Sequence, residues 1–137
     1  MIKNIIHDED FLKQPSAPAT KEDIPTAWDL IDTLAFHKEH CVGMAANMIG
    51  VLKNIIVINT GTETIAMLNP EIVKTSAKRY KTEEGCLSLN GERETERFES
   101  VEVKYRDMDW NKQKQKFSGF PAQIVQHEID HCNGILI

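Results

Sequence analysis

The stretch Gln126-His127-Glu128-Ile129-Asp130-His131, near the end of this 137-residue chain, decides how the rest of the sequence is interpreted. In a helix each residue turns by about 100°, so His127 and His131 lie about 40° apart around the axis and can reach one metal ion. Glu128 lies to one side of this pair, where it can act on a water molecule at the metal. Chance spacing on a polar face, or two buried histidines bound to backbone carbonyls, would give the same pattern, so a third ligand is decisive.

The third ligand is expected upstream of this segment. The metzincin proteases read His-Glu-x-x-His-x-x-Gly-x-x-His, and this chain follows that pattern to Gly134 but has Ile137 where the last histidine belongs. The upstream candidates, beside many carboxylates, are Cys41, Cys86, His7, His37 and His40. Cys86 stands out because Gly85 lets backbone approach a ligand and the β-forming residues after it predict a rigid strand. Cys41 and Cys132 are interpreted as small buried apolar residues.

Three motifs in this chain resemble those of the peptide deformylase family. The family carries Gly-x-Gly-x-Ala-Ala-x-Gln, then Glu-Gly-Cys-Leu-Ser, then Gln-His-Glu-x-Asp-His. The second motif is complete at residues 84–88 and the third at residues 126–131. The first departs from the pattern, because Cys41 replaces its first glycine and Met48 replaces its glutamine. The resemblance extends over the whole chain and implies a single peptide deformylase-like domain over residues 1–137.

The resemblance implies a set of site residues. Cys86, His127 and His131 would bind one divalent ion, and Glu128 would be the general acid and base. The backbone N–H of Leu87 would stabilise the oxyanion of the tetrahedral intermediate. Further backbone groups would pair with an extended peptide, and these belong to Val42, Gly43 and Gly85.

The implied reaction is hydrolysis of the formyl group from N-formylmethionyl peptides, including nascent chains at the ribosome. The resemblance implies Fe²⁺ in the cell, and a site with one thiolate and two imidazoles also suits Zn²⁺, Ni²⁺ or Co²⁺.

Met48 changes the chemistry of the first motif. A thioether has no hydrogen-bond donor, whereas loss of one oxyanion donor typically costs about 10²- to 10³-fold in turnover. Asn47 is adjacent and could donate instead, while Met48 is expected to line an apolar substrate pocket. Three functions therefore stay open. They are a deformylase, a deformylase-like metal protein that binds formyl or N-terminal peptides with little turnover, and a hydrolase of another small amide.

Length and charge narrow the class of protein. A chain of this size with 41% hydrophobic residues can supply one ordinary core. The net charge of -5 argues against an extended basic face and a nucleic-acid partner, so the lysine-rich segments 74–81 and 112–116 are expected to be solvated surface. No signal peptide is apparent and the longest apolar run, 55–58, cannot span a bilayer, so we expect a cytoplasmic protein with reduced thiols and no membrane partner.

Hydrophobic periodicity predicts an α+β fold with mostly antiparallel strands. One helix is expected to start near Pro25 and to run to about His40. The final helix should carry Pro121 in its first turn and bury Ala122, Val125 and Ile129. The strands are expected at residues 54–59, 64–69, 101–105 and 114–118.

Overall fold

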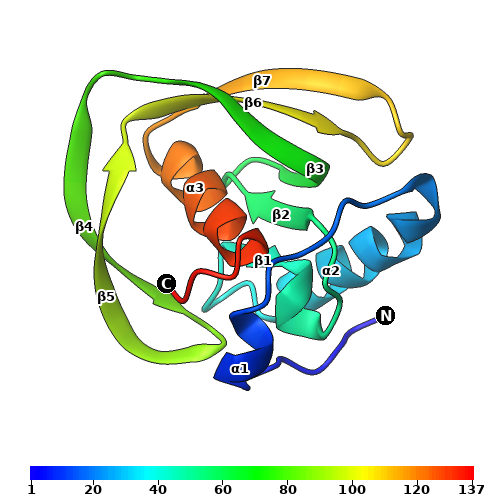
Figure 1. Cartoon of the computed structure of the whole chain (residues 1–137). Helices are drawn as coiled ribbons and strands as arrows, with labels where there is room; N and C mark the ends of the chain where they lie inside the picture. The colour runs from blue at the N-terminus through cyan, green and yellow to red at the C-terminus, as the bar shows by residue number, and fades with distance from the viewer.

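An antiparallel sheet of five strands forms the centre of the computed structural model, which describes residues 1–137 (Figure 1). The strands are β1 (Gly43–Ala45), β2 (Ile55–Asn59), β3 (Thr64–Thr75), β6 (Ser100–Arg106) and β7 (Lys112–Ser118). They lie in the order β1-β2-β3-β6-β7, so β1 and β7 are the two edge strands. The prediction of an α+β fold is therefore confirmed.

Strand β2 separates two apolar cores, because successive side chains of a strand point to opposite faces. Ile55 and Val57 pack toward helix α2 (Ile24–Phe36), in a core that also contains Leu30 and Leu34. Ile56 and Ile58 pack on the other face, against helix α3 (Phe120–Cys132). An uninterrupted apolar run is what a strand covered on both faces requires.

A separate hairpin carries the second motif and contacts helix α3, which carries the third motif. Its strands β4 (Arg79–Cys86) and β5 (Leu89–Phe98) form a two-stranded sheet, drawn in green to yellow at the left of Figure 1. An isolated hairpin is only marginally stable in water, so it needs an anchor. The side-chain amide of Gln126 supplies one, because it accepts from the backbone N–H of Phe98 at 2.8 Å and donates to its carbonyl at 2.9 Å.

Several expected boundaries were wrong. Helix α2 ends at Phe36, because the polar residues 37–40 offer no apolar face for a further turn. Strand β3 runs on to Thr75, past irregularities in its register with β6. Cys86 lies on a strand as its last residue, but residues 87–88 after it form the hairpin turn to β5 and do not continue the strand. Ile129 is only partly buried, and Ile124 takes the inward position.

The remaining elements are short. Helix α1 (Glu9–Leu12) and two 3-10 helices, η1 (Lys21–Asp23) and η2 (Ala46–Ile49), complete the chain. The lysines of segments 74–81 and 112–116 are exposed, as expected. No helix is long and apolar enough to cross a membrane.

Gly134 closes the end of α3 against the N-terminal segment. A Cβ at this position would lie 2.3 Å from the carbonyl oxygen of Lys13, and the residue has φ +76°. The segments meet again where the N–H of Ser16 donates to the carbonyl of Cys132 at 2.8 Å. The close contact therefore requires glycine for space as well as for conformation.

We expect Gly134→Ala to destabilise the protein more than Gly61→Ala. Both glycines have positive φ, but a Cβ at Gly61 would meet nothing within 4 Å. Backbone strain should cost about 1 kcal/mol in each variant, and overlap with Lys13 should add roughly 1–3 kcal/mol in Gly134→Ala. Urea unfolding measures both values. Equal losses would show that the overlap relaxes without cost.

Candidate active site

Helix α3 presents the two histidines of the third motif toward one point. Pro121 lies in its first turn, and Ala122, Ile124 and Val125 bury the helix in the core shared with β1 and β2. The two Nε2 atoms of His127 and His131 are 3.0 Å apart, and the rings meet edge to face. The i, i+4 spacing therefore brings both imidazoles together as the sequence predicts.

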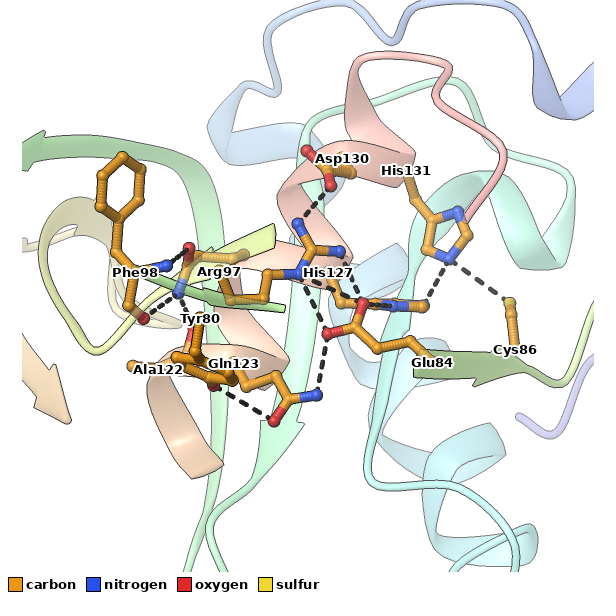
Figure 2. Close-up of polar contacts among 11 residues, drawn as sticks. Tyr80, Glu84, Cys86, Arg97, Phe98, Ala122, Gln123, His127, Asp130 and His131 are labelled. Carbon is orange, nitrogen blue, oxygen red and sulfur yellow. Dashed lines mark hydrogen bonds and ion pairs between the residues drawn. The ribbon is translucent and has the colours of Figure 1, made fainter. Parts of the chain in front are cut away.

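The thiol of Cys86 completes this cluster from the end of β4. Its Sγ lies 3.3 Å from His131 Nε2, and the ligand atoms of all three residues lie within 4.8 Å of one another (Figure 2). A tetrahedral ion with metal–sulfur bonds near 2.3 Å and metal–nitrogen bonds near 2.0 Å would separate its donors by about 3.3–3.6 Å. The cluster fits one divalent ion that accepts both sulfur and nitrogen.

A buried carboxylate orients one of these imidazoles. His127 Nδ1 lies 2.8 Å from Glu84 Oε1, and Arg97 donates to both oxygens of the same carboxylate, at 2.6 Å to Oε1 and 3.0 Å to Oε2. Burial raises the pKa of Glu84, but hydrogen bonds from His127, Arg97 and Gln123 outweigh it and hold the pKa at about 2. Because an ionised carboxylate only accepts, His127 donates from Nδ1 to Glu84, and Nε2 is the ring atom left to bind a metal once it loses its proton.

The charge state of the two imidazoles differs. Burial lowers the pKa of His131 to about 3, with a contribution from nearby His127, so His131 is neutral. Burial also lowers the pKa of His127, but hydrogen bonds to Cys86 and Glu84 outweigh burial and raise it to about 10. An imidazole must be neutral to bind a metal, so binding to this cluster releases a proton.

Glu128 is buried beside the cluster without being part of it. It is 4% exposed, and its Oε1 has no hydrogen-bond partner. Burial raises its pKa to about 7, which is suitable for a group that accepts and returns a proton near neutral pH. A Cβ at Gly43 would lie 2.8 Å from Glu128 Oε2 and 2.6 Å from Ile124 Cγ2, so only glycine lets β1 approach the helix here.

A cavity of about 490 Å³ opens above the cluster. Most residues singled out from the sequence line it, namely Val42, Gly43, Met48, Gly85, Cys86, Leu87, His127 and Glu128. His131 does not line the cavity and is fully buried. Other lining residues were missed, among them Phe120 and Gln123 on the first turn of α3. Their positions within the sequence gave no signal, because neither belongs to a motif.

Met48, at the altered motif position, and its neighbour Asn47 differ in whether their side chains line the cavity. Met48 lines the cavity, and its Sδ accepts a weak bond from the N–H of Ala45 at 3.5 Å. Asn47 does not line it, because its side-chain amide donates to the carbonyl of His131 at 3.0 Å. Asn47 is fully buried outside the cavity, so it is not placed to supply the missing donor.

The other upstream candidates for a ligand lie outside the cluster. His40 and Cys41 line the cavity, and the thiol of Cys41 donates to the carbonyl of Gly43 at 2.9 Å. Exposed His7 lies 3.1 Å, through Nδ1, from the carbonyl oxygen of Ser88. Cys132 is buried, as expected for a small apolar residue.

The whole chain is similar to known peptide deformylases. The profile of the polypeptide deformylase family matches residues 2–137. A peptide deformylase of Clostridium beijerinckii is 56% identical over 137 residues, which cover all of both chains. The crystal structure of peptide deformylase from Thermotoga maritima superposes with a TM-score of 0.90 at 30% identity, covering 99% of this chain and 95% of that one.

A second solved structure carries a peptide. It is the class I type b peptide deformylase from Acinetobacter baumannii with Met-Ala-Ser bound, which has a TM-score of 0.88 at 33% identity and covers 99% of this chain and 97% of that one. Sequence and fold agree over the full length of the chain. The cluster of one cysteine and two histidines beside a buried glutamate lies where the motifs predict. The chain therefore belongs to the peptide deformylase family and is an enzyme of that class.

Proposed function

We propose that this enzyme removes the formyl group from N-formylmethionyl peptides at the cavity above Cys86, His127 and His131. The observation that carries this proposal is the combination of the three ligand atoms, buried Glu128 and a cavity large enough for a peptide end. The related enzyme from Acinetobacter baumannii has Met-Ala-Ser bound, a peptide that begins with methionine as the proposed product does.

One divalent ion would be held by the three side chains, and it would supply Lewis-acid activation of water and of the formyl carbonyl. We propose Fe²⁺ as the ion in the cell, with Zn²⁺, Ni²⁺ or Co²⁺ as replacements, because a thiolate with two imidazoles accepts each of them. Glu84 keeps the His127 ring in the orientation that leaves Nε2 facing Cys86 and His131.

Glu128 would move the proton in this reaction. It accepts a proton from the attacking water, whose oxygen bonds to the formyl carbon, and it returns the proton to the departing amine as the C–N bond breaks. The products are formate and a peptide with a free N-terminus. The backbone N–H of Leu87 is proposed to donate to the oxyanion that forms between these steps.

The peptide is proposed to bind as an added strand. Strand β1 lies at the edge of the central sheet, and Val42 and Gly43 line the cavity, so the peptide would pair there. Gly85, on β4, also lines the cavity and would offer backbone groups to the peptide. Met48 would contact the substrate's apolar side chain. We further propose that the substrates are nascent chains at the ribosome, in the cytoplasm.

The runner-up is a deformylase-like protein that binds formyl or N-terminal peptides with little turnover. The observation that favours it is Met48, which lies at the cavity wall and has no donor for the oxyanion. Both functions require an intact metal centre and a peptide site, so metal content and peptide binding do not distinguish them. Measurements of turnover do.

Cys86→Ala should lose the bound ion, while Cys41→Ala should keep it. Both cysteines line the same cavity, but only Cys86 belongs to the cluster of ligand atoms. Metal content after loading with Fe²⁺ under anaerobic conditions measures the difference. Full occupancy in Cys86→Ala would contradict the proposed ligand set.

Glu128→Gln should keep the ion and lower formate release by at least about 10²-fold, because glutamine cannot transfer the proton. The two side chains have similar shape, so the packing against Gly43 should be retained. Formate release from formyl-Met-Ala-Ser, together with metal content, checks this expectation. Unchanged turnover would remove Glu128 from the mechanism.

Met48→Gln should raise kcat by about 10²-fold with a smaller change in KM, because it adds a donor for the developing oxyanion. Metal content should stay the same. A wild-type rate that is low and remains low in folded, metal-loaded Met48→Gln would instead support the binding protein. A rate that is already high in the wild type would show that another group stabilises the charge.

A further inference from the structure

Gln123 links the cavity wall to the carboxylate that orients His127. It lies one helical turn before His127 on α3, so both side chains leave the same face of the helix. Its Nε2 donates to Glu84 Oε2 at 2.9 Å, and its Oε1 accepts from the hydroxyl of Tyr80 at 3.3 Å (Figure 2). The amide of Gln123 thus lies between the Tyr80 hydroxyl and the Glu84 carboxylate, both of which belong to β4.

Gln123 completes the set of contacts on Glu84. Oε1 of this carboxylate is contacted by His127 and by Arg97 Nη2, while Oε2 is contacted by Arg97 Nε and Gln123. Arg97 is also drawn toward Asp130, to which its Nη1 donates at 2.6 Å. Gln123 is the contact on Oε2 that comes from the helix carrying the histidines, so it resists rotation of the carboxylate away from His127.

The orientation of the amide follows from the chemistry of its neighbours. An ionised carboxylate offers no donor, so the NH₂ group of Gln123 must face Glu84. The amide oxygen then faces Tyr80, whose hydroxyl can donate. Replacing this hydroxyl would free the amide to rotate about its last bond and would weaken its hold on Glu84.

This chain of contacts is accessible from the substrate side. Gln123 and Phe120 line both the cavity above the cluster and a second cavity of about 470 Å³. Tyr80 lines the second cavity. The side chain that holds Glu84 is therefore part of the lining of the proposed substrate cavity.

We propose that Gln123 is a positioning residue of the metal centre, which fixes Glu84 and through it the His127 ring, while Tyr80 fixes the amide of Gln123. This proposal rests on the proposed site, because it takes His127 as a ligand. Partners behind a metal-binding histidine typically change metal affinity or activity by about 10- to 100-fold when they are removed.

The test compares Gln123→Met with Val125→Ala. Methionine keeps the length and packing of glutamine but makes neither hydrogen bond. Val125 is on the same helix, but it is buried in the core with residues of the central sheet and does not line the cavity. It therefore serves as a control for general loosening of α3. Both variants and the wild type are loaded with Co²⁺, whose visible absorption reports the arrangement of its ligands.

Gln123→Met should weaken Co²⁺ binding by about 10-fold or more and shift the visible absorption. Val125→Ala should lower the stability of the fold while keeping the affinity and spectrum of the wild type. Wild-type affinity and an unchanged spectrum in Gln123→Met would overturn the proposal. Equal losses in the two variants would also overturn it, because they would assign the effect to helix packing.

Tyr80→Phe tests the outer contact. It should weaken Co²⁺ binding less than Gln123→Met does, and the double variant should be no weaker than Gln123→Met alone, since Tyr80 acts through the amide. Additive losses would contradict that order of contacts. These measurements use no substrate, so they stand even if the enzyme fails to release formate. Loss of Co²⁺ binding in Cys86→Ala separately verifies that the ion occupies the proposed site.

Discussion

The buried ion pair of Glu84 and Arg97 joins the β4–β5 hairpin to helix α3, and these two elements carry the proposed metal ligands. Glu84 lies on β4 and Arg97 on β5, and they are 7% and 4% exposed. Glu84 contacts His127 and Arg97 contacts Asp130, and both of these partners are on α3. A buried ion pair whose remaining atoms are hydrogen-bonded avoids most of the cost of burying charge, whereas removal of one partner leaves a costly unpaired ion. The hairpin is thereby held against the helix.

That attachment explains why the proposed ligands come from different elements. Cys86 ends β4 two residues after Glu84, so the contact that orients His127 also brings the thiol within 3.3 Å of His131. The hairpin is too polar and too small to be stable alone. Its position is determined by side-chain contacts with α3, and these same contacts set the geometry of the cluster.

The cavity has a similar dependence on close packing. Gly43 on β1 allows the sheet edge to approach Glu128 and Ile124, and burial of Glu128 follows from that approach. The environment that raises the pKa of this carboxyl is therefore made by a residue without a side chain. Met48, which also lines the cavity, adds apolar surface where the family motif has an amide. Formyl hydrolysis in this enzyme must proceed with that difference.

The sequence by itself determined the features that depend on local spacing. The motifs around Cys86 and the two histidines point to the family and to the proposed ligands of a metal. The i, i+4 spacing of the histidines and the apolar run of β2 predict a shared helix face and the central strand, because helical and strand periodicities are local properties. Tertiary structure decided the partners of these residues. Glu84 meets His127 across 43 positions and Arg97 meets Asp130 across 33. The hairpin of β4 and β5 has a polar sequence without clear alternation, and Asn47 turns toward α3 instead of the cavity. No local pattern encodes such contacts, since they arise only when separately folded segments pack together.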